Sequence, residues 1–184
     1  MGFTRFVSAV SALLFFTHFS HAQALSEKEA ELFALINTYR AEKNLPPVPF
    51  SPALTEVAQI HAKDLSEHNP DKADRCNMHS WSKKGKWTPC CYTRDHAEAA
   101  CMWKKPSELT DYTGDGFEIA FNTTGIPEPE DALKRWKGSP GHHNVIINAG
   151  TWKNTEWKAM GVGISGGYVL VWFGREEDPA AAAE

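Results

Sequence analysis

The feature that most constrains the fold of this 184-residue chain is the grouping of all its cysteines in one segment. These are Cys76, Cys90, Cys91 and Cys101. Four cysteines allow three connectivities if all of them pair. A bond between the adjacent Cys90 and Cys91 would strain the backbone. We therefore expect Cys76 and Cys101 each to bond one member of that pair, in either of the two remaining arrangements.

The N-terminal residues indicate the compartment in which these cysteines fold. Residues 6–16 form an apolar stretch behind the basic Arg5, and small-x-small motifs end at Ala22 and Ala24. This pattern predicts a signal peptide over residues 1–22, cleaved after Ala22 or Ala24, and a secreted or periplasmic protein. Disulfides are the default in an oxidising compartment, so we favour them over a zinc site built on Cys76-x-x-His79 and His96.

Charge and hydropathy exclude several classes of protein. The formal net charge is −4, which argues against a protein that binds nucleic acid through bulk positive charge. No apolar run reaches the roughly 18 residues of a membrane-spanning helix. Seven Trp and ten Phe supply ample core material, which excludes a disordered chain. We predict one domain over residues 25–175 that contains a disulfide-stapled insert at 67–115, followed by a flexible tail at 176–184.

Hydrophobic spacing predicts a mixed α+β fold. A capping box at Ser26-x-x-Glu29 begins a helix over 25–43, and Ser51 with Pro52 begins a second helix. His61 lies on the apolar stripe of the second helix, where we expect a satisfied core histidine. A short helix is expected over 127–138. Two apolar runs, 160–164 and 168–173, flank a Ser-Gly-Gly turn and predict a hairpin.

Two motifs in that hairpin resemble catalytic signatures but lack their context. Residues 163–167 fit the G-x-S-x-G nucleophile elbow, and residues 161–166 fit a dinucleotide-binding glycine pattern. The elbow needs a following helix and a later histidine, whereas no histidine follows His143. The glycine pattern likewise opens no helix. We interpret both as accidents of a glycine-rich turn.

Three separated residues form a plausible ligand set: His79, Glu118 and His142. Two imidazoles and a carboxylate suit zinc, with a fourth position left for water. Spacing alone does not bring these residues together, since tens of residues separate them.

Several motifs identify a family. They are Ile36-Asn37-x-x-Arg40, Leu54-x-x-x-Ala58-x-x-His61-Ala62, His79-Ser80, Trp136-x-x-Ser139-Pro140-Gly141-His142 and Gly161-x-Gly163. Over about residues 32–173 the chain resembles the CAP superfamily, the secreted SCP-like domain of cysteine-rich secretory proteins, venom antigen 5 and pathogenesis-related protein 1. Its bacterial branch is the most similar. The tryptophan-to-histidine run is the most specific of these motifs.

The resemblance implies a three-layer α-β-α sandwich with a central antiparallel sheet and an open cleft. In the family, two histidines and two glutamates line the cleft and can hold a divalent metal, often zinc. By motif match, His79, Glu118 and His142 take three of these positions. Ser139 stands where many members have the second glutamate, so we expect zinc or another divalent metal to bind only weakly. We interpret Ser139 as part of the turn before Pro140.

The same resemblance leaves two functions open. One is an exported binding protein whose cleft takes a lipid, carbohydrate or protein ligand. The other is a metal-dependent hydrolase, peptidase-like, in which Glu118 activates water on a metal held by His79 and His142. The chain has no His-Glu-x-x-His motif and no credible nucleophile triad. We therefore favour the binding protein over the enzyme.

Overall fold

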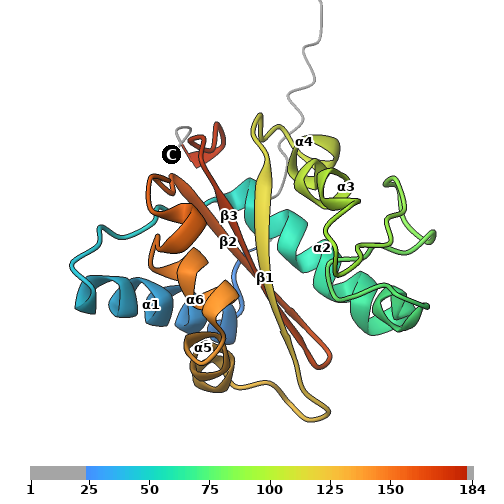
Figure 1. Cartoon of the computed structure of the whole chain (residues 1–184), viewed down its shortest axis with the longest axis horizontal. Helices are drawn as coiled ribbons and strands as arrows, with labels where there is room; N and C mark the ends of the chain where they lie inside the picture. The colour runs from blue at the N-terminus through green and yellow to red at the C-terminus, as the bar shows by residue number, and fades with distance from the viewer. Residues whose placement is uncertain (1–23, 182–184) are drawn as a thin grey trace, which may run out of the picture.

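The computed structural model describes residues 24–181, so the expected signal peptide over 1–22 lies outside the described residues. The elements are α1 (Glu27–Glu42), α2 (Pro52–His68), the 3₁₀ turn η1 (Pro70–Lys72), α3 (Ala99–Trp103), α4 (Lys105–Leu109), β1 (Gly116–Asn122), α5 (Pro129–Lys137), α6 (Pro140–Ile146), the 3₁₀ turn η2 (Gly150–Trp152), β2 (Ala159–Ser165) and β3 (Tyr168–Gly174) (Figure 1). No helix within 24–181 is long and apolar enough to cross a bilayer.

Both N-terminal helices begin where their capping residues predict. The Ser26 hydroxyl accepts from the Glu29 amide, and Glu29 Oε2 accepts from the Ser26 amide at 2.8 Å, which completes the capping box. At α2 the Ser51 hydroxyl accepts from the Leu54 amide at 3.0 Å. Glu29 does more than cap, because its other oxygen accepts from the Ile164 amide of β2 at 2.8 Å. The cap of α1 is thus also bonded to the sheet.

The sheet is antiparallel, with strand order β1-β3-β2. The expected hairpin is confirmed as β2 and β3, with Gly166 at φ 56° in its turn, a conformation that glycine adopts without strain. Because side chains alternate along a strand, Val171 and Phe173 point to one face of β3 and Leu170 and Trp172 to the other. All four are fully buried, so both faces of the sheet are covered.

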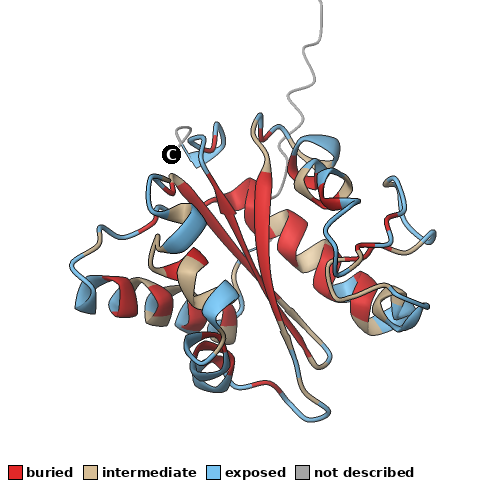
Figure 2. Cartoon of the chain, in the orientation of Figure 1, coloured by how far each residue is buried: buried red, intermediate tan, exposed pale blue. Residues whose placement is uncertain are grey.

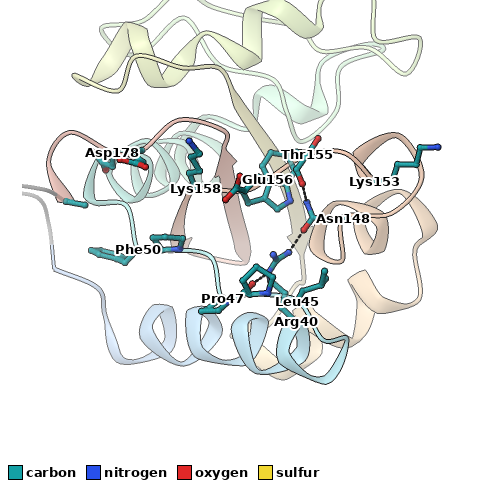
Figure 3. Close-up of a pocket in the computed structure, with 15 residues that line it drawn as sticks. Arg40, Leu45, Pro47, Phe50, Asn148, Lys153, Thr155, Glu156, Lys158 and Asp178 are labelled. Carbon is teal, nitrogen blue, oxygen red and sulfur yellow. Dashed lines mark hydrogen bonds between the residues drawn. The ribbon is translucent and has the colours of Figure 1, made fainter.

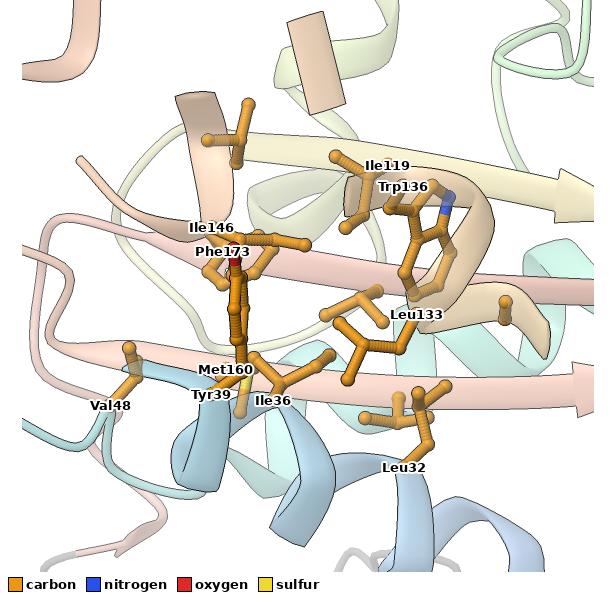
Figure 4. Packing of buried hydrophobic residues seen from close by; sticks show 14 of the residues in the cluster. Leu32, Ile36, Tyr39, Val48, Ile119, Leu133, Trp136, Ile146, Met160 and Phe173 are labelled. Atoms are coloured by element: carbon orange, nitrogen blue, oxygen red, sulfur yellow. The ribbon is translucent and has the colours of Figure 1, made fainter. Parts of the chain in front are cut away.

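Helices cover the two faces of the sheet to give three layers (Figures 1 and 2). On one face α1, α5 and α6 enclose the main core, in which Ile36, Trp136 and Ile146 meet Ile119 and Phe173 (Figure 4). On the other face α2 packs closely against β2, since a Cβ at Gly163 would lie 2.2 Å from the backbone of Ala58. The predicted α-β-α sandwich is confirmed.

The insert at 67–115 differs in part from expectation. It contains η1 and the five-residue helices α3 and α4, which the sequence pattern did not predict, whereas residues 73–98 hold neither helix nor strand apart from a bridge between Trp81 and Cys90. Two disulfides form, Cys76–Cys91 and Cys90–Cys101, in one of the two arrangements left open above. No free cysteine remains in the described chain.

The C-terminal segment is anchored beyond the predicted start of the tail at residue 176. Asp178 is buried, and its Oδ2 accepts from the Ser51 hydroxyl at 2.5 Å and from the Ala53 amide at 2.8 Å. An anion at a helix N-terminus is favoured by the unpaired amides there, and Asp178 takes this place on α2. The expectation of a flexible tail therefore needs correction as far as this residue.

Candidate functional site

Glu118 lies in the middle of β1 with its carboxylate directed toward α2 and completely buried. Its Oε2 lies 2.6 Å from Nδ1 of His61, and its Oε1 lies 2.7 Å from Nδ1 of His79. The first imidazole comes from α2 and the second from the stapled insert. One carboxylate thus joins three parts of the chain that are far apart in sequence.

The hydrogen-bond pattern assigns the protons in this cluster. Nε2 of His61 lies 2.9 Å from the Ser80 carbonyl oxygen, which can only accept, so this nitrogen donates. Burial raises the pKa of Glu118, but the charge and hydrogen bonds of His61 and His79 outweigh burial and hold that pKa below its usual range. His61 therefore bonds a carbonyl oxygen through one ring nitrogen and the Glu118 carboxylate through the other.

The same carboxylate orients the ring of His79. Its Nδ1 donates to Glu118, and its Nε2 has no hydrogen-bond partner among the described residues. The His79 side chain is 19% exposed, so this nitrogen belongs to a ring that reaches solvent. A carboxylate that orients an imidazole in this way is the usual support of a metal-ligating histidine.

Neighbouring polar contacts hold the segment that carries His79. Asp64 of α2 accepts from the Ser82 amide at 2.8 Å and from the Ser82 hydroxyl at 2.5 Å. The Ser80 hydroxyl accepts from the Tyr92 amide at 2.9 Å, and Trp81 stacks on His61 with ring centroids 4.0 Å apart. A loop without helix or strand is thereby fixed to α2.

His142 lies in the first turn of α6, not in an extended loop. Pro140 begins this helix and Ser139 occupies its N-cap position, with Oγ 2.9 Å from Nδ1 of His142. Burial, and then the charges of His79 and Arg135, lower the pKa of His142 below its usual value. The imidazole is therefore neutral at pH 7.

A groove of about 850 Å³ runs beside His142, between β1 and the α5–α6 corner. Apolar wall comes from Met78, Phe121 and Pro140, and positive charge comes from Lys134 and Arg135. A volume of this size falls within the range of ligand pockets, about 300–1,000 Å³. Of the four predicted site residues, Ser139 and His142 line this groove, whereas His79 and Glu118 do not.

The four predicted site residues form two bonded pairs, His79 with Glu118 and Ser139 with His142. Glu118 differs from the direct ligand expected of it, because both its oxygens are engaged and no part of its side chain is exposed. No group of three or more His, Cys, Asp or Glu side chains within 24–181 is arranged to hold a metal ion. Nε2 of His79 and Nε2 of His142 have no hydrogen-bond partner among the described residues.

His61 is the member of the Glu118 cluster that the sequence pattern did not assign to the site. It is fully buried and hydrogen-bonded through both nitrogens, so the prediction of a satisfied core histidine is confirmed. It also holds Glu118, which the apolar stripe of α2 did not indicate. The sequence did offer one indication. A buried imidazole is costly unless its nitrogens are hydrogen-bonded, so a histidine on an apolar stripe implies polar partners elsewhere in the chain.

Known proteins share this fold. The family model of CAP, the cysteine-rich secretory protein family, matches residues 33–168. An extracellular protein with an SCP domain from Bacillus anthracis is 18% identical with a TM-score of 0.54, over 81% of this chain and 40% of that one. An outer surface protein of Borrelia burgdorferi is 17% identical with a TM-score of 0.56, over 83% of this chain and 95% of that one.

A cysteine-rich secretory protein of Staphylococcus aureus is 15% identical with a TM-score of 0.51, over 81% of this chain and 39% of that one. The chain thus spans about 40% of the length of the Bacillus and Staphylococcus proteins. At these identities the similarity concerns the fold. No curated protein matches the chain in sequence.

Proposed function

The chain belongs to the CAP family of cysteine-rich secretory proteins, and from this we propose that it is an exported binding protein whose groove beside His142 takes a lipid, carbohydrate or protein ligand. Export is supported by the signal-peptide pattern of residues 1–22, by two disulfides, and by neighbours described as an extracellular protein and an outer surface protein.

The observation that carries the proposal is the state of Glu118. A general base must reach the water that it activates, directly or through one further water. Both oxygens of Glu118 accept from imidazoles and the side chain has no exposed surface. The carboxylate is therefore suited to holding His79 in place and poorly suited to proton transfer at a substrate. This argues for binding over the alternative of a metal-dependent hydrolase.

The two free imidazole nitrogens also support weak binding of a divalent metal. Nε2 of His79 and Nε2 of His142 would hold the ion, and Glu118 and Ser139 would orient the two rings through their Nδ1 atoms. A bound ion would supply a Lewis-acidic point with open positions for oxygen or nitrogen atoms of a ligand. Two protein ligands are fewer than the four of structural zinc sites, so the affinity should be low.

Activity screening tests the choice between binding and hydrolysis. Purified mature protein is assayed against peptidase and esterase substrates, with zinc and with a chelator. We expect no turnover above buffer in either case. Turnover that the chelator abolishes, and that Glu118→Gln also abolishes in a folded variant, would reverse the proposal.

Calorimetry tests the metal site with tag-free protein and zinc chloride at pH 7.5. Wild type should bind one ion weakly, and the His79→Ala, His142→Ala double variant should not bind. His143→Ala is the matched control, because His143 is the adjacent imidazole but its Nε2 is bonded to the Tyr39 hydroxyl at 2.8 Å. Binding that persists in the double variant, or that disappears in the control, would show that these rings do not hold the ion.

A further inference from the structure

A second pocket of about 660 Å³ lies away from the groove beside His142 and shares no lining residue with it. It is bounded by the segment that follows α1, by the segment that precedes β2, and by the C-terminal residues up to Ala181. Figure 3 shows Phe50 and Lys158 on one side, Asn148 and Thr155 on the other, and Arg40 with Pro47 below. The family motifs described above assign it no ligand.

Arg40 brings an unbalanced positive charge to this pocket. Only 2% of its surface is exposed, and its hydrogen bonds go to neutral oxygens alone. Nε donates to the Pro46 carbonyl at 3.1 Å, and Nη1 donates to the Ile146 carbonyl and to Asn148 Oδ1, each at 2.6 Å. No carboxylate within residues 24–181 lies within 4 Å of the guanidinium, since no ion pair includes Arg40.

The free edge of the guanidinium is accessible from the pocket. Nη2 donates to no acceptor in the described chain, whereas Nε and Nη1 are fully used. Nη2 keeps some accessible surface, because the fully buried polar side-chain atoms without a partner in the described region belong to Thr55, Gln59, Trp81 and Trp172. Arg40 as a whole is 2% exposed, and it is among the residues that line the pocket.

Burial makes this arrangement receptive to an anion. Desolvation lowers the pKa of Arg40, with no opposing effect from a nearby acid. A guanidinium so placed still carries its charge and would gain strongly from a planar carboxylate on its free edge.

The rest of the pocket suits the body of an organic acid. Pro47, Trp157 and the exposed ring of Phe50 provide apolar wall beside the charged end. The acids that also line it are Glu156, Glu177 and Asp178, and the further cations are Lys153 and Lys158. Asp178 is already bonded at the start of α2, and neither Glu156 nor Glu177 forms an ion pair with Arg40. Of the three cations that line the pocket, Arg40 is the one that is buried.

We propose that this pocket binds small organic carboxylates, with the acid group on Nη2 of Arg40 and an apolar body against Pro47, Phe50 and Trp157. This site is independent of the function proposed for the groove beside His142. A free carboxylate is the shared requirement, whether it belongs to a small metabolite or to the C-terminus of a short peptide.

The test uses the folded mature chain labelled with ¹⁵N and two probes of the same shape. These are 3-phenylpropionate, which carries a carboxylate, and 3-phenylpropanamide, which does not. Titration at pH 7.5 should shift the backbone amides of Phe50 and Trp157 in a saturable way. The acid should bind about tenfold or more tightly than the amide, the factor expected for one charge-assisted hydrogen bond.

Variants locate the site. Phe50→Ser should weaken binding of the acid several-fold, whereas Ile126→Ser is the control for loss of an exposed apolar residue, since Ile126 is 80% exposed and outside the pocket. If circular dichroism shows that Arg40→Gln is folded, this variant should bind the acid and the amide equally. If the variant is unfolded, the comparison of the two probes on wild-type protein tests the proposal instead. The proposal is wrong if the two probes bind with equal affinity or if no backbone amide shifts in a saturable way. It is also wrong if the amide shifts are confined to the groove beside His142, or if Phe50→Ser binds the acid as tightly as wild type does. A C-terminally free peptide and its amide then distinguish the two sources of carboxylate.

Discussion

Trp136 holds α5 against the free edge of the sheet, and its replacement tests the fold most directly. β1 pairs with β3 on one side only, so its other edge has no strand partner. The fully buried indole lies at that edge, and its Nε1 donates to the Ala120 carbonyl at 3.1 Å. Trp136 therefore supplies both core volume and the partner of a buried backbone oxygen.

The two contributions can be separated by two substitutions. Trp136→Phe keeps most of the apolar volume but leaves the Ala120 carbonyl without its donor, which costs about 1–3 kcal/mol. Trp136→Ala also opens a cavity, and truncation of a buried tryptophan costs roughly 3–5 kcal/mol. For a chain of this size each kcal/mol lowers Tm by about 2–4 °C, so the alanine variant should melt roughly 6–20 °C below wild type.

The assay is urea unfolding followed by circular dichroism, with disulfides intact, together with thermal melts. Trp87→Phe is the matched control, because its indole also donates to a carbonyl, that of Ser82 at 2.9 Å, but in a half-buried loop. We expect the control to cost less than Trp136→Phe. Equal losses in the two phenylalanine variants, or a melting temperature unaffected by Trp136→Ala, would refute the assignment of Trp136 to a sealed strand edge.

Further predictions concern other parts of the fold. Thiol titration under denaturing, non-reducing conditions should find no free thiol in mature protein, and reduction of the two disulfides should lower the unfolding free energy by about 2–5 kcal/mol for each bond. The unfolding free energy should fall as pH drops below about 6.5, because the lowered pKa of folded His142 means that the unfolded chain binds a proton that the folded chain does not. Urea titrations of His142→Gln should show an unfolding free energy that depends less on pH. Asp178→Asn should cost about 1–3 kcal/mol in urea unfolding by weakening two charge-assisted bonds. Gly163→Ala should cost about 1–3 kcal/mol in the same assay, because the new Cβ meets the backbone of α2.

Local features of the fold were predictable because their causes are local. Ser26 and Glu29 cap α1 through atoms three residues apart, and Ser51 does the same for α2. The glycines between β2 and β3 likewise specify a turn by their own conformational freedom. In contrast, Pro140-Gly141 reads as a turn, yet proline is also favoured at the first position of a helix, and here it begins α6.

The disulfide arrangement shows what adjacency leaves undecided. Cys90 and Cys91 were equivalent as partners, but the bridge to Trp81 turns Cys90 inward, where it is 7% exposed, while Cys91 faces solvent. Cys90 therefore meets Cys101 of α3, and Cys91 meets Cys76. That choice depends on tertiary packing, which no spacing in the segment encodes.

The candidate site could be predicted only from the family resemblance, because its residues are brought together by tertiary packing. His61 and Glu118 are 57 positions apart, and nothing in either local sequence indicates a buried hydrogen bond between them. Asp178 was hidden for a similar reason, because an acid in an alanine-rich terminus looks like exposed chain until the N-terminus of α2 is placed beside it.

The strand order has a consequence for how the protein matures. Within residues 24–181, β3 is the last strand and the central one, and it is the strand with which both β1 and β2 pair. During synthesis, β1 must wait about fifty residues before its neighbour exists, so no part of the sheet can assemble vectorially from the N-terminus. A nascent chain lacking residues 168–174 would hold two solitary strands and a partly formed core. The sheet of such a chain is completed only once residues 168–174 have been synthesised.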